Sequence, residues 1–120
     1  IPAMLALWRE VFALPQWLCV ARGDEASPRP LMVAADQGPM LLVFSTPDRA
    51  RIGAAAAGIP EAEVQRMLSV PMPQAVSWAA SLAQHGVFGV VIDYGTVGGF
   101  TPLANLVRML DHFAIESDDV

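Results

Sequence analysis

Polar side chains of several kinds stand at the ends of two apolar runs, residues 40–44 and 87–94, that the pattern predicts as strands. The candidate positions are hydroxyls, carboxylates, a guanidinium, a phenol and glycines: Ser45, Thr46, Asp48, Arg49, Asp93, Tyr94, Gly95, Gly98, Gly99 and Thr101. In open α/β sheets, ligands bind outside the carboxyl ends of strands and often at helix N-termini. If the two strands are neighbours, these residues share one edge, and we hypothesise that this edge recognises a small ligand or a partner peptide. The alternative is that two ordinary helices with capping residues begin here.

The glycine-rich loop from Gly95 to Gly99 does not carry a phosphate-binding pattern. It reads Gly-Thr-Val-Gly-Gly, and we expect it to be a flexible turn that connects a strand to a helix. A dinucleotide site needs Gly-x-Gly-x-x-Gly, and a phosphate loop needs Gly-Lys followed by Ser or Thr. All seven basic residues are arginine, so the chain has no lysine for a phosphate loop or a Schiff base. No cofactor is therefore expected.

The cysteine and the two histidines do not form a catalytic or metal-binding pattern. Cys19 lies within a predicted strand, without the helix N-terminus, cation or histidine that a reactive thiolate needs, so we expect a buried structural thiol. His85 and His112 stand at unrelated spacings, and no metal site is expected. Asp93 is left as the carboxylate that could act as a general base if the domain were an enzyme.

Length, composition and charge limit the class of protein and the kinds of partner that it can have. With 120 residues the chain is long enough for one domain with a real core, which we place over residues 1–120. The net charge of −5 without a basic cluster argues against nucleic acid, and no apolar run reaches the roughly 18–20 residues that span a membrane. The single cysteine, and a first segment unlike a signal peptide, predict a cytoplasmic protein. The chain does not begin with Met, which predicts an excerpt of a longer chain or a trimmed one.

The apolar content predicts that part of the surface is covered. Apolar residues make up 54% of the chain, above the roughly 45–50% of ordinary globular domains, and charged residues only 16%. We therefore expect a protein partner or self-association, with a homodimer or a larger parent protein as the two forms this could take.

Hydrophobic periodicity and helix-breaking residues predict an α/β domain. Helices are predicted at 4–14, 47–57, 73–84 and from 101, and strands at 17–21, 31–35, 40–44, 65–70 and 87–94. The turn at 36–39 predicts a hairpin in the first half, and the alternation in the second half predicts parallel βαβ crossovers. The unalternating run 90–92 predicts an interior strand. We expect three layers: a mixed sheet of about five strands with helices on both faces.

Two stretches carry a family resemblance: Met40-Leu-Leu-Val-Phe-Ser-Thr-Pro-Asp-Arg-Ala50 and Gly89-Val-Val-Ile-Asp-Tyr-Gly95. They resemble the N-terminal domain of the enhanced serine sensitivity protein B (SseB) family, in its strand followed by Phe-Thr/Ser and acidic-Arg-Ala, and in its late strand that ends in glycine. The family usually has Asn-Pro-Gly where this chain has Asp93-Tyr94-Gly95. The resemblance covers most of residues 14–110 and implies a small α/β domain with no established catalytic chemistry.

These observations favour a non-catalytic interaction or regulatory module. The alternative is a small-molecule-binding or enzymatic domain that uses the strand ends near Thr46 and Asp93, with Asp93 as general base and the Thr101 helix start as an anion site.

Overall fold

The computed structural model describes residues 2–23, 26, 28–64, 66–72, 74–96, 98–106, 108–109 and 111. In chain order its elements are α1 (Pro2–Ala13), β1 (Gln16–Arg22), β2 (Arg29–Pro30), β3 (Met32–Ala35), β4 (Gly38–Val43) and α2 (Pro47–Ala56). They continue with the 3₁₀ turn η1 (Glu61–Glu63), β5 (Met67–Pro71), α3 (Gln74–Ser81), the 3₁₀ turn η2 (Leu82–His85), β6 (Gly89–Ile92) and β7 (Gly99–Pro102). Helical residues resume at 103–106.

The start of α2 follows directly from its sequence. The Thr46 hydroxyl accepts a hydrogen bond of 3.1 Å from the backbone N–H of Arg49, which satisfies one of the free donors of the first turn. Pro47 occupies the first helical position, where a missing N–H costs nothing, and Asp48 lies in the first turn at the positive end of the helix dipole. The predicted helix start is therefore confirmed.

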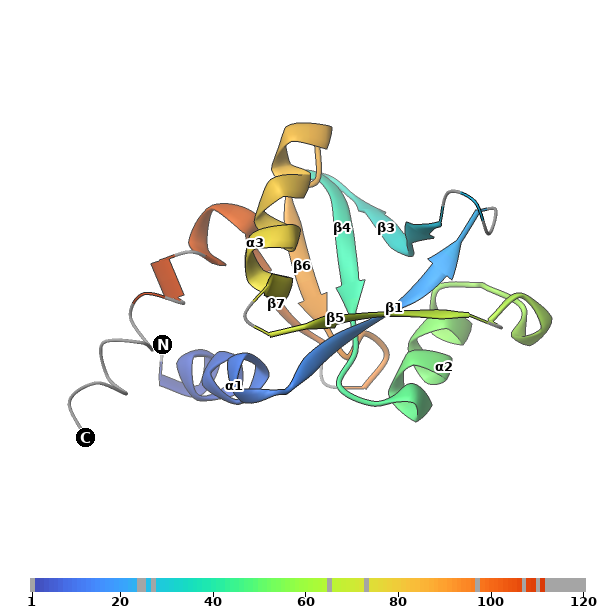
Figure 1. The fold of residues 1–120 in the computed structure, drawn as a ribbon, viewed down its shortest axis with the longest axis horizontal. Coiled ribbons are helices and arrows are strands. Elements are labelled where there is room, and N and C mark those ends of the chain that lie inside the picture. The colour runs from blue at the N-terminus through green and yellow to red at the C-terminus, as the bar shows by residue number, and fades with distance from the viewer. Residues whose placement is uncertain are drawn as a thin grey trace.

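The strands form two sheets that are linked by backbone hydrogen bonds. The three-stranded sheet has the order β2-β1-β5, and the four-stranded sheet has the order β3-β4-β6-β7. Leu18 of β1 and Phe44, just after β4, exchange backbone hydrogen bonds of 3.0 and 2.7 Å that link the sheets. In Figure 1, β1 and β5 cross in front of β4 and β6. The predicted α/β class is confirmed, but the expected single sheet of about five strands is wrong: the described residues form seven strands in two sheets.

The strands β4 and β6 are parallel neighbours, with Leu41 opposite Val90 and Val43 opposite Ile92. β6 lies between β4 and β7, so the predicted interior position of this strand is confirmed. β5 lies instead in the other sheet, antiparallel to β1, and is not part of a parallel crossover.

The core lies on both faces of β4. Leu41 and Val43 belong to one buried cluster, together with Trp8 of α1 and residues of α3. Leu42 belongs to a second buried cluster that α2 covers. Burial on both faces explains why this strand reads as a continuous apolar run instead of alternating with polar residues.

The segment after β6 differs from the expectation. The pair Thr101-Pro102 is typical of a helix start, but both residues lie in β7, which runs antiparallel to β6. The cause is a tight reversal of the chain, because Asp93, Gly95 and Gly98 all have positive φ, at 52°, 89° and 72°. The predicted strand-to-helix loop is therefore wrong: the loop closes a β-hairpin, and helical residues begin at 103.

Candidate functional site

The ends of β4 and β6 meet as the hypothesis of a shared edge requires. The pairing of the two strands ends at Val43 and Ile92, and the backbone N–H of Asp93 donates to the carbonyl of Val43 at 2.9 Å. The residues that follow each strand, Ser45 on one side and Asp93 on the other, are in direct contact. The condition on which the shared edge depends, that the two strands are neighbours, is therefore met.

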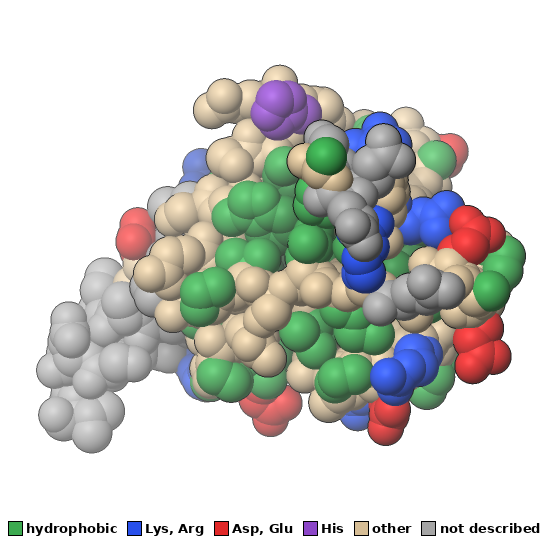
Figure 2. Space-filling model, turned by 45° about the vertical axis from the view of Figure 1, so that its right-hand side comes forward, with side chains coloured by type: hydrophobic (Ala, Val, Ile, Leu, Met, Phe, Trp, Pro, Cys, Tyr) green, Lys and Arg blue, Asp and Glu red, His purple; other side chains and the backbone are tan. Residues whose placement is uncertain are grey.

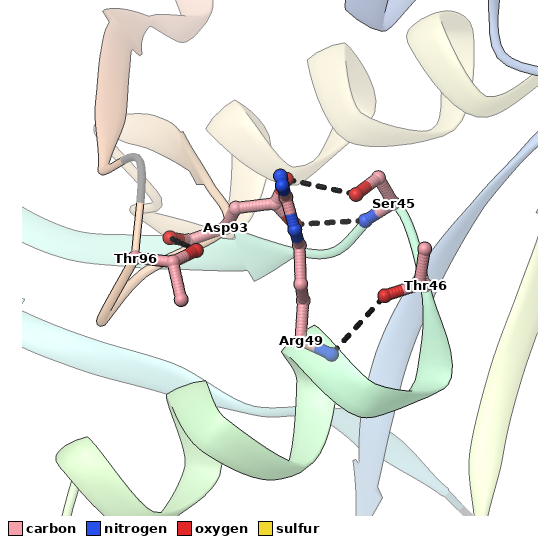
Figure 3. Close-up of polar contacts among 5 residues, drawn as sticks. All are labelled: Ser45, Thr46, Arg49, Asp93 and Thr96. Atoms are coloured by element: carbon pink, nitrogen blue, oxygen red, sulfur yellow. Dashed lines mark hydrogen bonds and ion pairs between the residues drawn. The ribbon is translucent and has the colours of Figure 1, made fainter.

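The carboxylate of Asp93 is the centre of this edge. Its Oδ1 accepts a hydrogen bond of 2.9 Å from the backbone N–H of Ser45, and its Oδ2 accepts one of 2.8 Å from the Ser45 hydroxyl. The guanidinium of Arg49 reaches up from α2 and donates to Oδ2 at 2.7 Å, as Figure 3 shows. The Asp93 side chain is 4% exposed, whereas that of Arg49 is 44% exposed. This charge is buried but fully paired, as buried carboxylates must be.

The backbone of Asp93 holds the hairpin turn. Its carbonyl accepts hydrogen bonds from the backbone N–H and the hydroxyl of Thr96, both at 3.0 Å, and from the N–H of Gly98 at 3.1 Å. Asp93 is also the described non-glycine residue with positive φ, a conformation that aspartate adopts more readily than most residues. One residue therefore ties the β6–β7 turn to the start of α2, and we call this set of contacts the Asp93 clamp.

The helix α2 packs closely against the residues that follow β4 and β6. Gly53 lies opposite Phe44 and Tyr94, so that a Cβ at this position would stand 2.7 Å from the carbonyl oxygen of Tyr94 and would overlap the Phe44 ring. The absent side chain lets the helix pack directly on the end of the sheet. Tyr94 itself packs against the cluster under α2.

Other predicted site residues have separate positions. Asp48 points outward, with its side chain 91% exposed and paired with Arg51 at 2.9 Å. Gly99 begins β7 opposite Ile92, while Thr101 is buried in β7 opposite Val90, two residue pairs back from the strand end. Thr101 is therefore not part of the edge, and the idea that it starts a helix with an anion site is wrong.

A cleft of about 280 Å³ opens beside the Asp93 clamp. Its lining comes from α1 with the residue that follows it, and from the strand-end edge: Leu7, Glu10, Val11, Leu14, Ser45, Arg49, Ile92 and Asp93. We call it the Arg49 cleft. The four residues of the α1 side were not predicted, because only tertiary packing brings that helix to the edge.

The remaining reactive groups lie elsewhere. Cys19 is fully buried in β1, as predicted, and burial raises the pKa of its thiol from 9.0 to about 12. His85 ends the η2 turn, and His112 lies outside the described residues. Within the described part of the chain, no three His, Cys, Asp or Glu side chains form a group that could hold a metal ion. No helix of that part is long and apolar enough to cross a membrane.

Comparison of the sequence with models of protein families and with curated proteins finds no match.

Proposed function

We propose that this chain is a non-catalytic interaction module that binds a segment of a partner protein in the Arg49 cleft. The proposal agrees with the resemblance to the SseB N-terminal domain, and with it we propose the three-layer arrangement expected for such a domain. The observation that carries it is the state of the polar groups at the edge: the Asp93 carboxylate is fully used inside the molecule, while Arg49 is half exposed beside an apolar wall.

The fixed position of Arg49 suits recognition. A guanidinium carries five N–H donors in a planar fork, and the described bond to Asp93 uses one of its two terminal nitrogens. The Asp93 clamp therefore orients the side chain without consuming its capacity to bind a second carboxylate. Because the guanidinium is held before binding, less side-chain entropy is lost when a partner docks.

The chemistry of the cleft defines the segment it would bind. Leu7, Val11 and Leu14 provide an apolar wall, and Arg49 provides a cation beside it. We infer that the partner presents an apolar side chain next to an Asp or Glu. Glu10, also in the lining, disfavours a second acidic residue on the α1 side.

The alternative, a small-molecule-binding or enzymatic domain with Asp93 as general base, has less support. A general base must reach the proton that it abstracts, and both oxygens of Asp93 already accept hydrogen bonds from Ser45 and Arg49. The carboxylate is also nearly inaccessible to solvent.

A peptide library displayed on phage, selected against the purified chain, tests the proposal. We expect enrichment of peptides that carry an acidic residue next to an apolar one, and loss of their binding on Arg49→Ala and Leu14→Ala substitution. Arg29→Ala is the matched control, because it removes an exposed arginine of β2 that lies outside the cleft. Selected peptides that bind all four proteins equally would refute recognition in this cleft.

A further inference from the structure

A second hollow lies on the outer side of α2, away from the residues of the Arg49 cleft. It has a volume of about 400 Å³ and is bounded on one side by α2 and on the other by the segment around η1. The helix side contributes Arg51, Ile52 and Ala55, and the η1 side contributes Ile59, Glu61 and Val64. We call this hollow the α2 groove.

An exposed apolar side chain, that of Ile52, lies beside the apolar hollow of the α2 groove. Ile52 is 49% exposed, the highest value among the large hydrophobic side chains that the structure describes as exposed. The other two, Phe88 and Phe100, stack on each other with ring centroids 6.1 Å apart, so each shields part of its neighbour. Ile52 instead projects beside the half-buried Ile59 and Val64, which form the opposite side of the groove.

The two sides of the groove also carry opposite charges, Arg51 on the helix and Glu61 on the η1 side. Figure 2, which brings the α2 side of Figure 1 forward, shows basic and acidic side chains interspersed with hydrophobic ones on its right-hand part. The described partner of Arg51 is Asp48, but both side chains are more than half exposed. Such a pair contributes little and leaves Arg51 able to turn toward another carboxylate.

We propose that the α2 groove is the interface of a two-fold symmetric homodimer. A two-fold axis that runs along the groove places the helix side of one copy against the η1 side of the other. Ile52 then enters the apolar hollow of the partner, and Arg51 faces the partner's Glu61, with both contacts repeated by symmetry. A surface that carries both members of each complementary pair fits a second copy of itself, which is the requirement of an isologous interface.

This inference goes beyond the proposed function, because it concerns a different surface whose lining shares no residue with the Arg49 cleft. Variants of the Arg49 cleft report on the partner segment, and variants of the α2 groove report on self-association. The two proposals can therefore fail separately.

Sedimentation equilibrium of the full chain, between roughly 10 μM and 1 mM, measures the self-association directly. The variants are Arg51→Glu, Glu61→Arg, the double variant and Ile52→Glu. Arg29→Glu, an exposed residue of β2, changes the net charge as Arg51→Glu does and serves as the matched control. Thermal unfolding of each variant checks that it is folded.

The wild-type chain is expected to dimerise. Each single charge reversal juxtaposes like charges twice across the axis and should weaken the dimer by about tenfold or more. The double variant should restore it, and Ile52→Glu should abolish it, while Arg29→Glu changes little. A wild-type chain that stays monomeric throughout this range would overturn the proposal. So would folded single variants that dimerise like the control, or a folded double variant that does not recover.

Discussion

Replacing Asp93 by alanine tests whether the Asp93 clamp stabilises the fold as its geometry indicates. The substitution removes three hydrogen bonds of 2.7–2.9 Å at once and leaves the N–H of Ser45 without its acceptor. Hydrogen bonds to charged groups contribute about 1.5–3 kcal/mol each, but not additively. The bond to Arg49 belongs at the low end because its guanidinium is 44% exposed. Alanine also tolerates the φ of 52° less well than aspartate.

Together these effects predict that Asp93→Ala lowers the free energy of unfolding by about 3–4 kcal/mol. Asp93→Asn is the informative comparison, because asparagine keeps an acceptor for the Ser45 N–H and adopts positive φ, but loses the charge. We expect it to cost about 1–2 kcal/mol. Urea denaturation followed by tryptophan fluorescence measures both values, with the buried Trp8 and Trp17 as reporters. If alanine costs less than about 0.5 kcal/mol, or no more than asparagine, the three hydrogen bonds of the Asp93 carboxylate do not stabilise the fold.

Substitutions at three further positions test the packing of α2, its N-terminal cap and the burial of the thiol. Gly53→Ala forces a Cβ onto the Phe44 ring and the Tyr94 carbonyl, and should cost about 2 kcal/mol or more in urea denaturation; an unchanged midpoint would contradict this close approach. Thr46→Ala removes the cap of α2 and should cost about 1 kcal/mol, whereas Thr46→Ser should be nearly neutral; equal losses would rule out the capping role. The buried thiol of Cys19, whose pKa burial raises from 9.0 to about 12, stays protonated in the fold while the unfolded chain ionises. The free energy of unfolding of the wild-type chain, measured relative to that of Cys19→Ala, should therefore be constant below pH 9 and fall by about 1.4 kcal/mol per pH unit above it. A difference that does not depend on pH up to pH 11 would show that the thiol is not buried.

Local chemistry made the start of α2 predictable. The capping hydroxyl of Thr46, the proline after it and the acidic first turn act within four residues, so no tertiary information was needed. The unalternating run of residues 90–92, which belongs to β6, indicated an interior strand, and β6 does lie between β4 and β7. That Ser45 and Asp93 share one edge was a hypothesis that depended on the two strands being neighbours, which the pairing of β4 with β6 shows them to be.

Longer-range features were less accessible. The four-residue strand β7 is too short for a periodic pattern, and its Thr101-Pro102 pair has the same composition as a helix start. The turn before β7 depends on the positive φ of Asp93, and a single aspartate in a sequence does not predict that conformation. The pairing of β5 with β1 and the position of α1 beside the edge depend on tertiary packing, because several apolar surfaces of the chain could pack against one another. For that reason neither the sheet order nor the α1 side of the Arg49 cleft was predicted.

NMR chemical-shift mapping with a selected acidic–apolar peptide shows which surface of the chain binds the peptide, and we expect that surface to be the Arg49 cleft. We expect the largest amide shift changes in α1 and at the β4–α2 junction, with saturable binding that Arg49→Ala weakens by about tenfold or more. Shift changes concentrated around the α2 groove or another face, or binding that Arg49→Ala leaves unchanged, would contradict recognition in the Arg49 cleft.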